Sequence, residues 1–137
     1  MTYQRIKLPY ELNELEPIVY FETMYYHYEI LHKNYELKLT ETLRAGTGSA
    51  LIKQFPTLEK LLENLLSLPV ELQDEVRFFG GGLLNHNFFF LHLTTMEQHS
   101  EANISQELLG VINQEFTNLA NLKKKLVESA LKIRGSG

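Results

Sequence analysis

The chain has 137 residues, of which 44% are apolar and 22% are charged, and its formal net charge is −4. This length suits one domain that can bury its own core. The acidic balance, without a basic block, argues against a nucleic-acid-binding or anionic-membrane surface. The absence of cysteine excludes disulfides, zinc–thiolate sites and thiol catalysis. No apolar run reaches the ~18 residues that span a bilayer, so we expect no membrane span.

The first twenty residues are expected to form an extended, irregular arm. Pro9 and Pro17 restrict their neighbours and discourage a continuous helix. The first seven residues contain neither an apolar signal core nor an Arg- and Ser-rich presequence. We therefore expect a cytoplasmic protein, or a mitochondrial one if a presequence was removed.

Residues 21–45 are expected to form a first long helix. Apolar or aromatic side chains recur there at helical spacing, at positions 21, 24, 28, 31, 35, 39 and 43. His27, Leu31 and Tyr35 are four residues apart, which places them on one face of an α-helix. Residues 45–49 are expected to form a loop, with Gly46 as the C-cap of the helix.

Residues 57–94 are expected to hold short helices and then a second histidine-bearing helix. A broad leucine stripe lies between Pro56 and Pro69, and Pro69 suits the first turn of the next helix. Three consecutive glycines at 80–82 would weaken an exposed helix, so we expect two backbones to pass closely there. His86 begins an apolar helical stretch with Phe90 on the same face.

Residues 103–134 are expected to form C-terminal helices after a polar loop. Asn103 and Gln106 resemble a capping box. The last helix is expected to present an apolar face made of Leu119, Leu122, Leu126, Ala130 and Ile133. Because alternating β-branched runs do not occur, the predicted fold is all-α. It is a long antiparallel helical hairpin with shorter flanking helices, in a single domain over 1–137.

Two facing helices that each carry a histidine, His27 and His86, could point both imidazoles at one place and form half of a metal site. The alternative is that both are core histidines with hydrogen-bond partners. Fe and Mn normally take more ligands than two, including carboxylates. Tyr35 can equally be a tyrosine at the edge of the core. His32, His92 and His99 are expected to face solvent or lie in loops.

Several stretches, in order, resemble the iron/manganese superoxide dismutases. Leu8-Pro9-Tyr10 and Leu15-Glu16-Pro17 resemble the N-terminal arm of that family. His27, His32 and Tyr35 resemble its first helix. The segment from Arg77 through the glycines to Asn85-His86 resembles its second ligand helix. The end of the chain, 130–137, is similar to the segment that precedes the β-sheet of the family's C-terminal domain.

The resemblance implies that His27 and His86 are ligands of Fe or Mn, and that Tyr35 is the tyrosine near the substrate entrance. In the family, an Asp and a His from an Asp-x-Trp-Glu-His motif in the C-terminal α/β domain complete the site. This sequence has no Trp and no such motif. We therefore expect the lone chain to be inactive, with or without bound metal. It would need a protein partner: a chain resembling the C-terminal domain, another copy of itself, or a larger assembly.

Departures from the family pattern favour an alternative. Where the family has polar or Trp side chains, this chain has Tyr28, Leu31, Phe78-Phe79, Leu83 and Phe90. Such polar neighbours orient metal ligands and tune the metal. The alternative is therefore a catalytically silent structural or interaction subunit that presents an apolar surface to a partner. A third reading is that self-association brings two histidine pairs together around a metal or haem.

Overall fold

The computed structural model describes residues 3–44 and 48–134, and within these ranges the regular elements are helices, with no strand. The all-α prediction is confirmed. The chain divides between Glu97 and Gln98 into two compact units, which are described one at a time. The single domain over 1–137 stays a prediction.

The first long helix runs without a break through α1 (Phe21–Met24), η1 (Tyr25–His32) and α2 (Lys33–Arg44). Its middle part, η1, has the wide π-helical pitch, in which a backbone N–H bonds to the carbonyl five residues earlier. The helix agrees with the predicted range up to Arg44. Residue 45 and the predicted C-cap Gly46 lie outside the described residues.

The second long helix consists of α5 (Val70–Glu75), η3 (Val76–Gly80) and α6 (Gly81–Leu91). Its middle part, η3, is also π-helical. The sequence had suggested that Pro69 lies in the first turn of this helix. It is instead the N-cap residue before α5.

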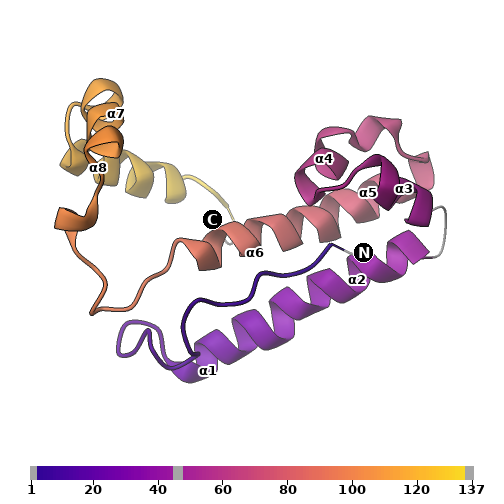
Figure 1. Cartoon of the computed structure of the whole chain (residues 1–137), viewed down its shortest axis with the longest axis horizontal. Helices are drawn as coiled ribbons and strands as arrows, with labels where there is room; N and C mark the ends of the chain where they lie inside the picture. Colours follow the sequence, from indigo (N-terminus) through magenta and orange to yellow (C-terminus); the bar gives the residue numbers. More distant parts are fainter. Residues whose placement is uncertain (1–2, 45–47, 135–137) are drawn as a thin grey trace. The chain divides into compact units, whose positions relative to one another are not determined.

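The two long helices form an antiparallel hairpin (Figure 1). The beginning of the first helix, at η1, packs against α6 at the end of the second. The end of the first helix, α2, packs against α5 and η3. This arrangement brings residues near 27 and residues near 86 to the same level of the hairpin.

Shorter helices cover one end of the hairpin: α3 (Gly48–Gln54), α4 (Leu58–Glu63) and the 3-10 turn η2 (Leu65–Ser67). Helix α3 was not predicted, because its glycine-rich beginning was interpreted as a loop. Leu51 in α3 and Phe55 just after it are buried, and this burial stabilises the segment beyond its local propensity.

Two apolar cores stabilise the first unit. The larger core joins α2, the short helices and the second long helix through Tyr3, Leu39, Leu43, Leu51, Phe55, Leu58, Leu61, Leu68, Val76 and Leu83. The smaller core lies under the N-terminal arm and contains Tyr10, Leu15, Met24, Tyr28 and Phe90. The arm is irregular, as predicted, but it is tied to the hairpin by buried side chains.

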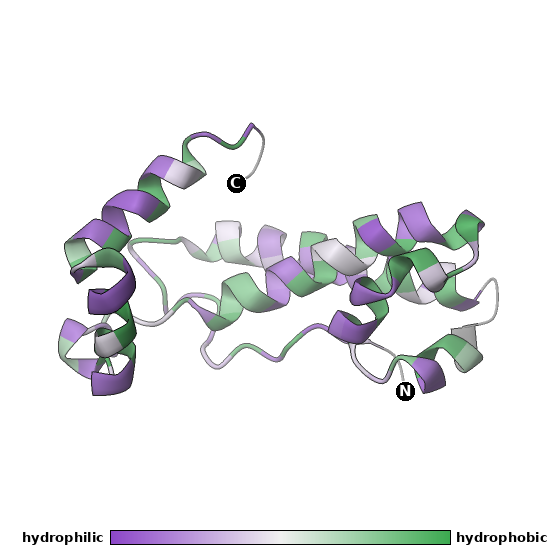
Figure 2. Cartoon of the chain, turned by 90° about the horizontal axis from the view of Figure 1, so that it is seen from above, coloured by the Kyte–Doolittle hydropathy of each residue, from purple (hydrophilic) through white to green (hydrophobic). Residues whose placement is uncertain are grey.

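The second unit contains the 3-10 turn η4 (Glu101–Asn103), α7 (Gln106–Phe116) and α8 (Leu119–Ala130). Hydrophobic and hydrophilic residues interleave along these helices (Figure 2). Of the predicted apolar face, Leu126 and Ile133 are exposed, at 60% and 59%, and Ile133 lies beyond the end of α8.

The predicted capping box at Asn103 and Gln106 is wrong. Ser105 caps α7, with its hydroxyl accepting a hydrogen bond from the Leu108 N–H at 3.1 Å. Asn103 lies in η4, and its amide donates to the Gln98 carbonyl at 3.1 Å. The serine side chain accepts a hydrogen bond from a free backbone N–H in the first turn, which is the role that the sequence analysis had given to Asn103.

Candidate metal centre

The hairpin brings the two predicted histidines together. His27 lies on η1 and His86 on α6. Their ring centroids are 4.9 Å apart and the ring planes are nearly perpendicular, at 89°. Both side chains are half-buried. Two imidazoles at this separation can approach one ion with small changes of side-chain angle.

A hydrogen bond fixes the tautomer of His86. Its Nδ1 lies 2.7 Å from the Gly82 carbonyl oxygen, one turn earlier on the same helix. Because a carbonyl only accepts, Nδ1 carries the proton and Nε2 keeps its lone pair. This is the second contact that metal-ligating histidines commonly make, and it leaves Nε2 as the atom that can bind an ion.

The surroundings of His27 favour its neutral form. Burial, and then the nearby His86, lower the pKa of His27. The rings of Phe89 and Phe90 lie against it, with centroids at 5.2 and 5.0 Å. A neutral imidazole is the form that binds metals, and this environment favours that form of His27.

The expectation that His32 faces solvent is wrong. His32 has no exposed surface, and neither of its ring nitrogens makes a well-formed hydrogen bond, although Asn87 and the Leu83 backbone lie near the ring. The ring stacks on Phe90 at 5.4 Å and on His86 at 5.5 Å. The cause is the π-helical pitch, which aligns residues five apart and so brings His32 onto the face of His27. Leu31, expected on that face by α-helical spacing, is 44% exposed.

Burial dominates the ionisation of His32. Burial, and then the neighbouring His86, lower the pKa of His32 to about 4; Arg5 adds to the lowering, while Asn87 and the Leu83 backbone act in the opposite direction. An imidazole with two unpartnered nitrogens in an apolar setting is neutral at pH 7. His92 and His99 are exposed, as expected.

Tyr35 lies beside His86, with ring centroids 5.0 Å apart. It is half-buried and also contacts Phe78, at 6.0 Å. Across the hairpin its ring covers Gly82, where a Cβ atom would come within 2.4 Å of the ring. The sequence had predicted that two backbones pass closely at the glycines, but the group that approaches Gly82 is the Tyr35 side chain, and a Cβ on Gly81 would meet nothing within 4 Å.

The sequence had suggested that the apolar replacements around the histidine pair form one surface. In the structure they do not. Leu83 and Phe90 have no exposed surface and belong to the cores. Phe79 is half-buried against the larger core. Phe78 is 63% exposed and Leu31 is 44% exposed. Only part of the replaced set is therefore open to a partner.

The described residues bring two histidines together without a third ligand beside them. Among residues 3–44 and 48–134, no group of three or more His, Asp or Glu side chains could hold a metal ion. Two acids of the first long helix, Glu29 and Glu36, pair with Arg5 at 3.2 and 3.6 Å. The pair offers two imidazoles, and Fe or Mn would need further ligands.

The fold and the site define a helical hairpin domain that presents two apposed histidines from its long helices. A family model described as "Iron/manganese superoxide dismutases, alpha-hairpin domain" matches residues 2–94. The chain belongs to the iron/manganese superoxide dismutase family.

The relatives align with the whole of this chain, but this chain covers only part of the length of each relative. It is 34% identical over 137 residues to the superoxide dismutase (Mn) of Listeria innocua serovar 6a, covering 100% of this chain and 64% of that protein. The corresponding protein of Listeria ivanovii is 36% identical, also with 64% of its length covered. That of Chlamydia pneumoniae is 32% identical, with 61% covered. The chain thus spans less than two thirds of these relatives. No helix in the described residues is long and apolar enough to cross a membrane.

Proposed function

We propose that this chain supplies two histidine ligands, His27 and His86, to a redox Fe or Mn site of the superoxide dismutase type. The observation that carries the proposal is the apposition of the two rings at 4.9 Å, with His86 Nδ1 bonded to Gly82 and Nε2 left to bind. Membership of the family, and relatives named as manganese enzymes, support the choice of metal.

The bound ion would supply the one-electron chemistry of superoxide disproportionation. The residues of this chain hold and shape the site. Burial keeps His27 neutral, and Phe89 and Phe90 shield it on one side. Tyr35 lies next to His86 and is positioned to orient a molecule that approaches the pair.

Two imidazoles do not complete an Fe or Mn site, since these ions favour additional oxygen ligands. We therefore propose that the lone chain is inactive and that a protein partner supplies the remaining ligands. The partner of choice is a polypeptide that resembles the C-terminal domain of the family and carries an Asp-x-Trp-Glu-His segment. The remaining ligands could otherwise come from another copy of this chain or from a larger assembly.

The test is elemental analysis of the chain purified alone and after co-expression with a polypeptide that carries the C-terminal domain of a relative. We expect bound Fe or Mn and superoxide dismutation in the complex, and neither in the lone chain. The variant with His27→Ala and His86→Ala is the control and should lose the metal. A stable complex without Fe or Mn would overturn the proposal.

A second candidate is a catalytically silent subunit that packs against a partner. It is favoured by the exposed apolar side chains beside the pair, Leu31, Phe78 and Phe89, which are 44%, 63% and 44% exposed. Contiguous exposed apolar patches commonly mark interaction sites. Sedimentation of the pure chain distinguishes the cases: a stable monomer that co-purifies with nothing would remove the reason for this candidate.

A further inference from the structure

The backbone N–H and carbonyl of Ile6 in the N-terminal arm are held by the two residues that follow the candidate ligands. The Ile6 N–H donates to Asn87 Oδ1 at 2.9 Å. The Tyr28 hydroxyl donates to the Ile6 carbonyl oxygen at 2.7 Å. Tyr28 follows His27 in η1, and Asn87 follows His86 in α6. One arm residue therefore connects the two long helices at the level of the histidine pair.

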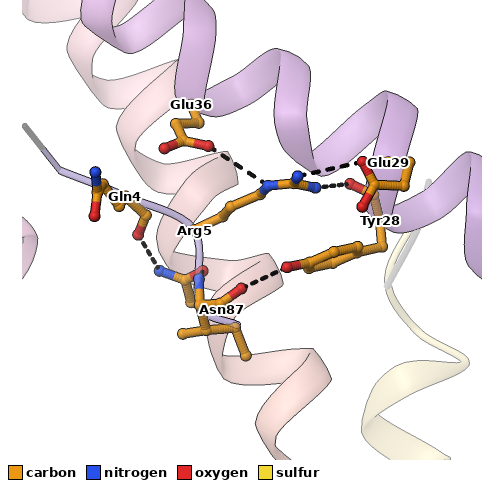
Figure 3. Close-up of polar contacts among 7 residues, drawn as sticks. Gln4, Arg5, Tyr28, Glu29, Glu36 and Asn87 are labelled. Carbon is orange, nitrogen blue, oxygen red and sulfur yellow. Dashed lines mark hydrogen bonds and ion pairs between the residues drawn. The ribbon is translucent and has the colours of Figure 1, made fainter. Parts of the chain in front are cut away.

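Neighbouring contacts reinforce this connection (Figure 3). The Asn87 amide also donates to the Gln4 carbonyl, at 3.3 Å. The Arg5 guanidinium donates to the Tyr28 carbonyl at 2.9 Å and lies over the Tyr28 ring at 4.3 Å. It pairs with Glu29 and Glu36 as well, and its side chain is only 19% exposed. The arm is thus fixed to both helices by directional contacts.

Fixing Tyr28 and Asn87 also fixes the rotation of each helix about its own axis. Successive residues of a helix point in well-separated directions, roughly 100° apart in an α-helix, so the residue after each histidine faces the arm while the histidine faces across the hairpin. A helix with side chains has a radius of about 5–6 Å. A rotation of about 15° would therefore displace an imidazole nitrogen by roughly 1–2 Å. Metal sites tolerate about 0.2 Å in ligand distance.

We propose that Tyr28 and Asn87 are positioning residues that, by holding the Ile6 backbone between them, orient His27 and His86 for a divalent metal ion. The inference rests on the proposed role of the pair as ligands. Neither Tyr28 nor Asn87 would touch the ion. Their contribution is the direction in which the ligand side chains point.

A purely structural role for the two residues is the competing explanation, and a matched control separates it. Thr42 on α2 donates to Glu75 on α5 at 2.8 Å, which joins the same two helices fifteen residues beyond His27. Thr42→Val removes this bond with little change in shape. It should lower stability without changing the rotation of the helices at the histidine pair.

The experiment compares Tyr28→Phe, Asn87→Ala and Thr42→Val in the 137-residue chain. Each variant is measured for urea unfolding and for Zn²⁺ affinity by calorimetry, with His27→Ala/His86→Ala as the background for other histidines. We expect Tyr28→Phe and Asn87→Ala to weaken Zn²⁺ binding by about 10- to 100-fold, as loss of partners around metal ligands does. The Zn²⁺ affinity of Thr42→Val should stay within about 2-fold of that of the original chain, at a comparable loss of stability. Equal weakening in all three variants would overturn the inference.

Proton NMR of the metal-free chain gives an independent readout. The cross-relaxation between the His27 and His86 rings should weaken in Tyr28→Phe and Asn87→Ala and persist in Thr42→Val. If the original chain shows no Zn²⁺ binding above the double-alanine background, two imidazoles alone do not hold the ion, and the ring contacts then decide whether Tyr28 and Asn87 position the pair. Unchanged contacts in Tyr28→Phe and Asn87→Ala would refute it.

Discussion

The ring of Tyr35 covers Gly82 so closely that a Cβ atom on residue 82 would lie 2.4 Å from two of its ring carbons. The tyrosine comes from the first long helix and the glycine from the second. Since Tyr35 also contacts His86, the absence of a side chain at residue 82 decides where this ring lies relative to the histidine pair.

Gly82→Ala is expected to push Tyr35 away from His86 and to destabilise the chain by about 1–3 kcal/mol, the usual cost of overpacking, less the helix-propensity gain of alanine. Gly81→Ala is the matched control, because no atom would lie within 4 Å of its Cβ. It should stabilise the helix by up to about 1 kcal/mol. Urea unfolding of both variants measures the difference, and equal effects at the two positions would contradict the close packing.

His32→Leu is expected to stabilise the chain at pH 7 by about 1 kcal/mol. The substitution removes two buried nitrogens that lack partners, whose desolvation costs about 1–3 kcal/mol, and it keeps a similar volume. His92→Leu, at an exposed position, should change stability by less than about 0.5 kcal/mol. A clear loss of stability in His32→Leu, measured by urea unfolding, would mean that the ring is hydrogen-bonded after all.

Stability should fall as the pH drops from about 6.5 to about 4. Burial holds the pKa of His32 at about 4 in the folded chain, below its ordinary value of 6.5. The unfolded chain therefore takes up a proton in this window while the folded chain does not. The loss amounts to roughly 3 kcal/mol at most and is complete below pH 4. Between pH 4 and 7.5, the free energy of unfolding should depend less on pH in His32→Leu than in the original chain. An equal pH dependence in both would contradict the assignment of this effect to His32.

Tyr10→Phe is expected to cost about 1–2 kcal/mol. The Tyr10 hydroxyl donates at 2.8 Å to the carbonyl of Phe90, near the end of α6, where helix carbonyls lack partners within the helix. Tyr20→Phe, at a side chain that is 58% exposed, serves as the control and should be nearly neutral. Thermal unfolding of the two variants provides the measurement. A neutral Tyr10→Phe would show that the arm is not fastened at this point.

Periodicity predicted an all-α hairpin and the first long helix. The second was expected in pieces, a short helix after Pro69 and a stretch from His86, and the structure joins these through the glycines. Helix α3 was not predictable, because its stability comes from burying Leu51 and the following Phe55 against the hairpin and not from its own glycine-rich beginning. Local patterns do not report such tertiary burial.

His32 was misplaced for a related reason. A count of 3.6 residues per turn puts Leu31 on the face of His27, and only a wider turn brings His32 there. The contacts of Ile6 with Tyr28 and Asn87 were also missed, since they join residues 22 and 81 positions apart. No spacing rule connects an irregular arm to a helix over such separations.

The π-helical pitch of η1 makes the length of the segment Tyr25–His32 a requirement in itself. A wide turn behaves like an α-helix into which an extra residue has been inserted. Deleting one residue there would let the segment rewind to the ordinary α-helical pitch, in which residues four apart share a face. Although several side chains in this segment are exposed and open to substitution, its residue count and its pitch are therefore coupled, because a change in one alters which side chains share a face with His27.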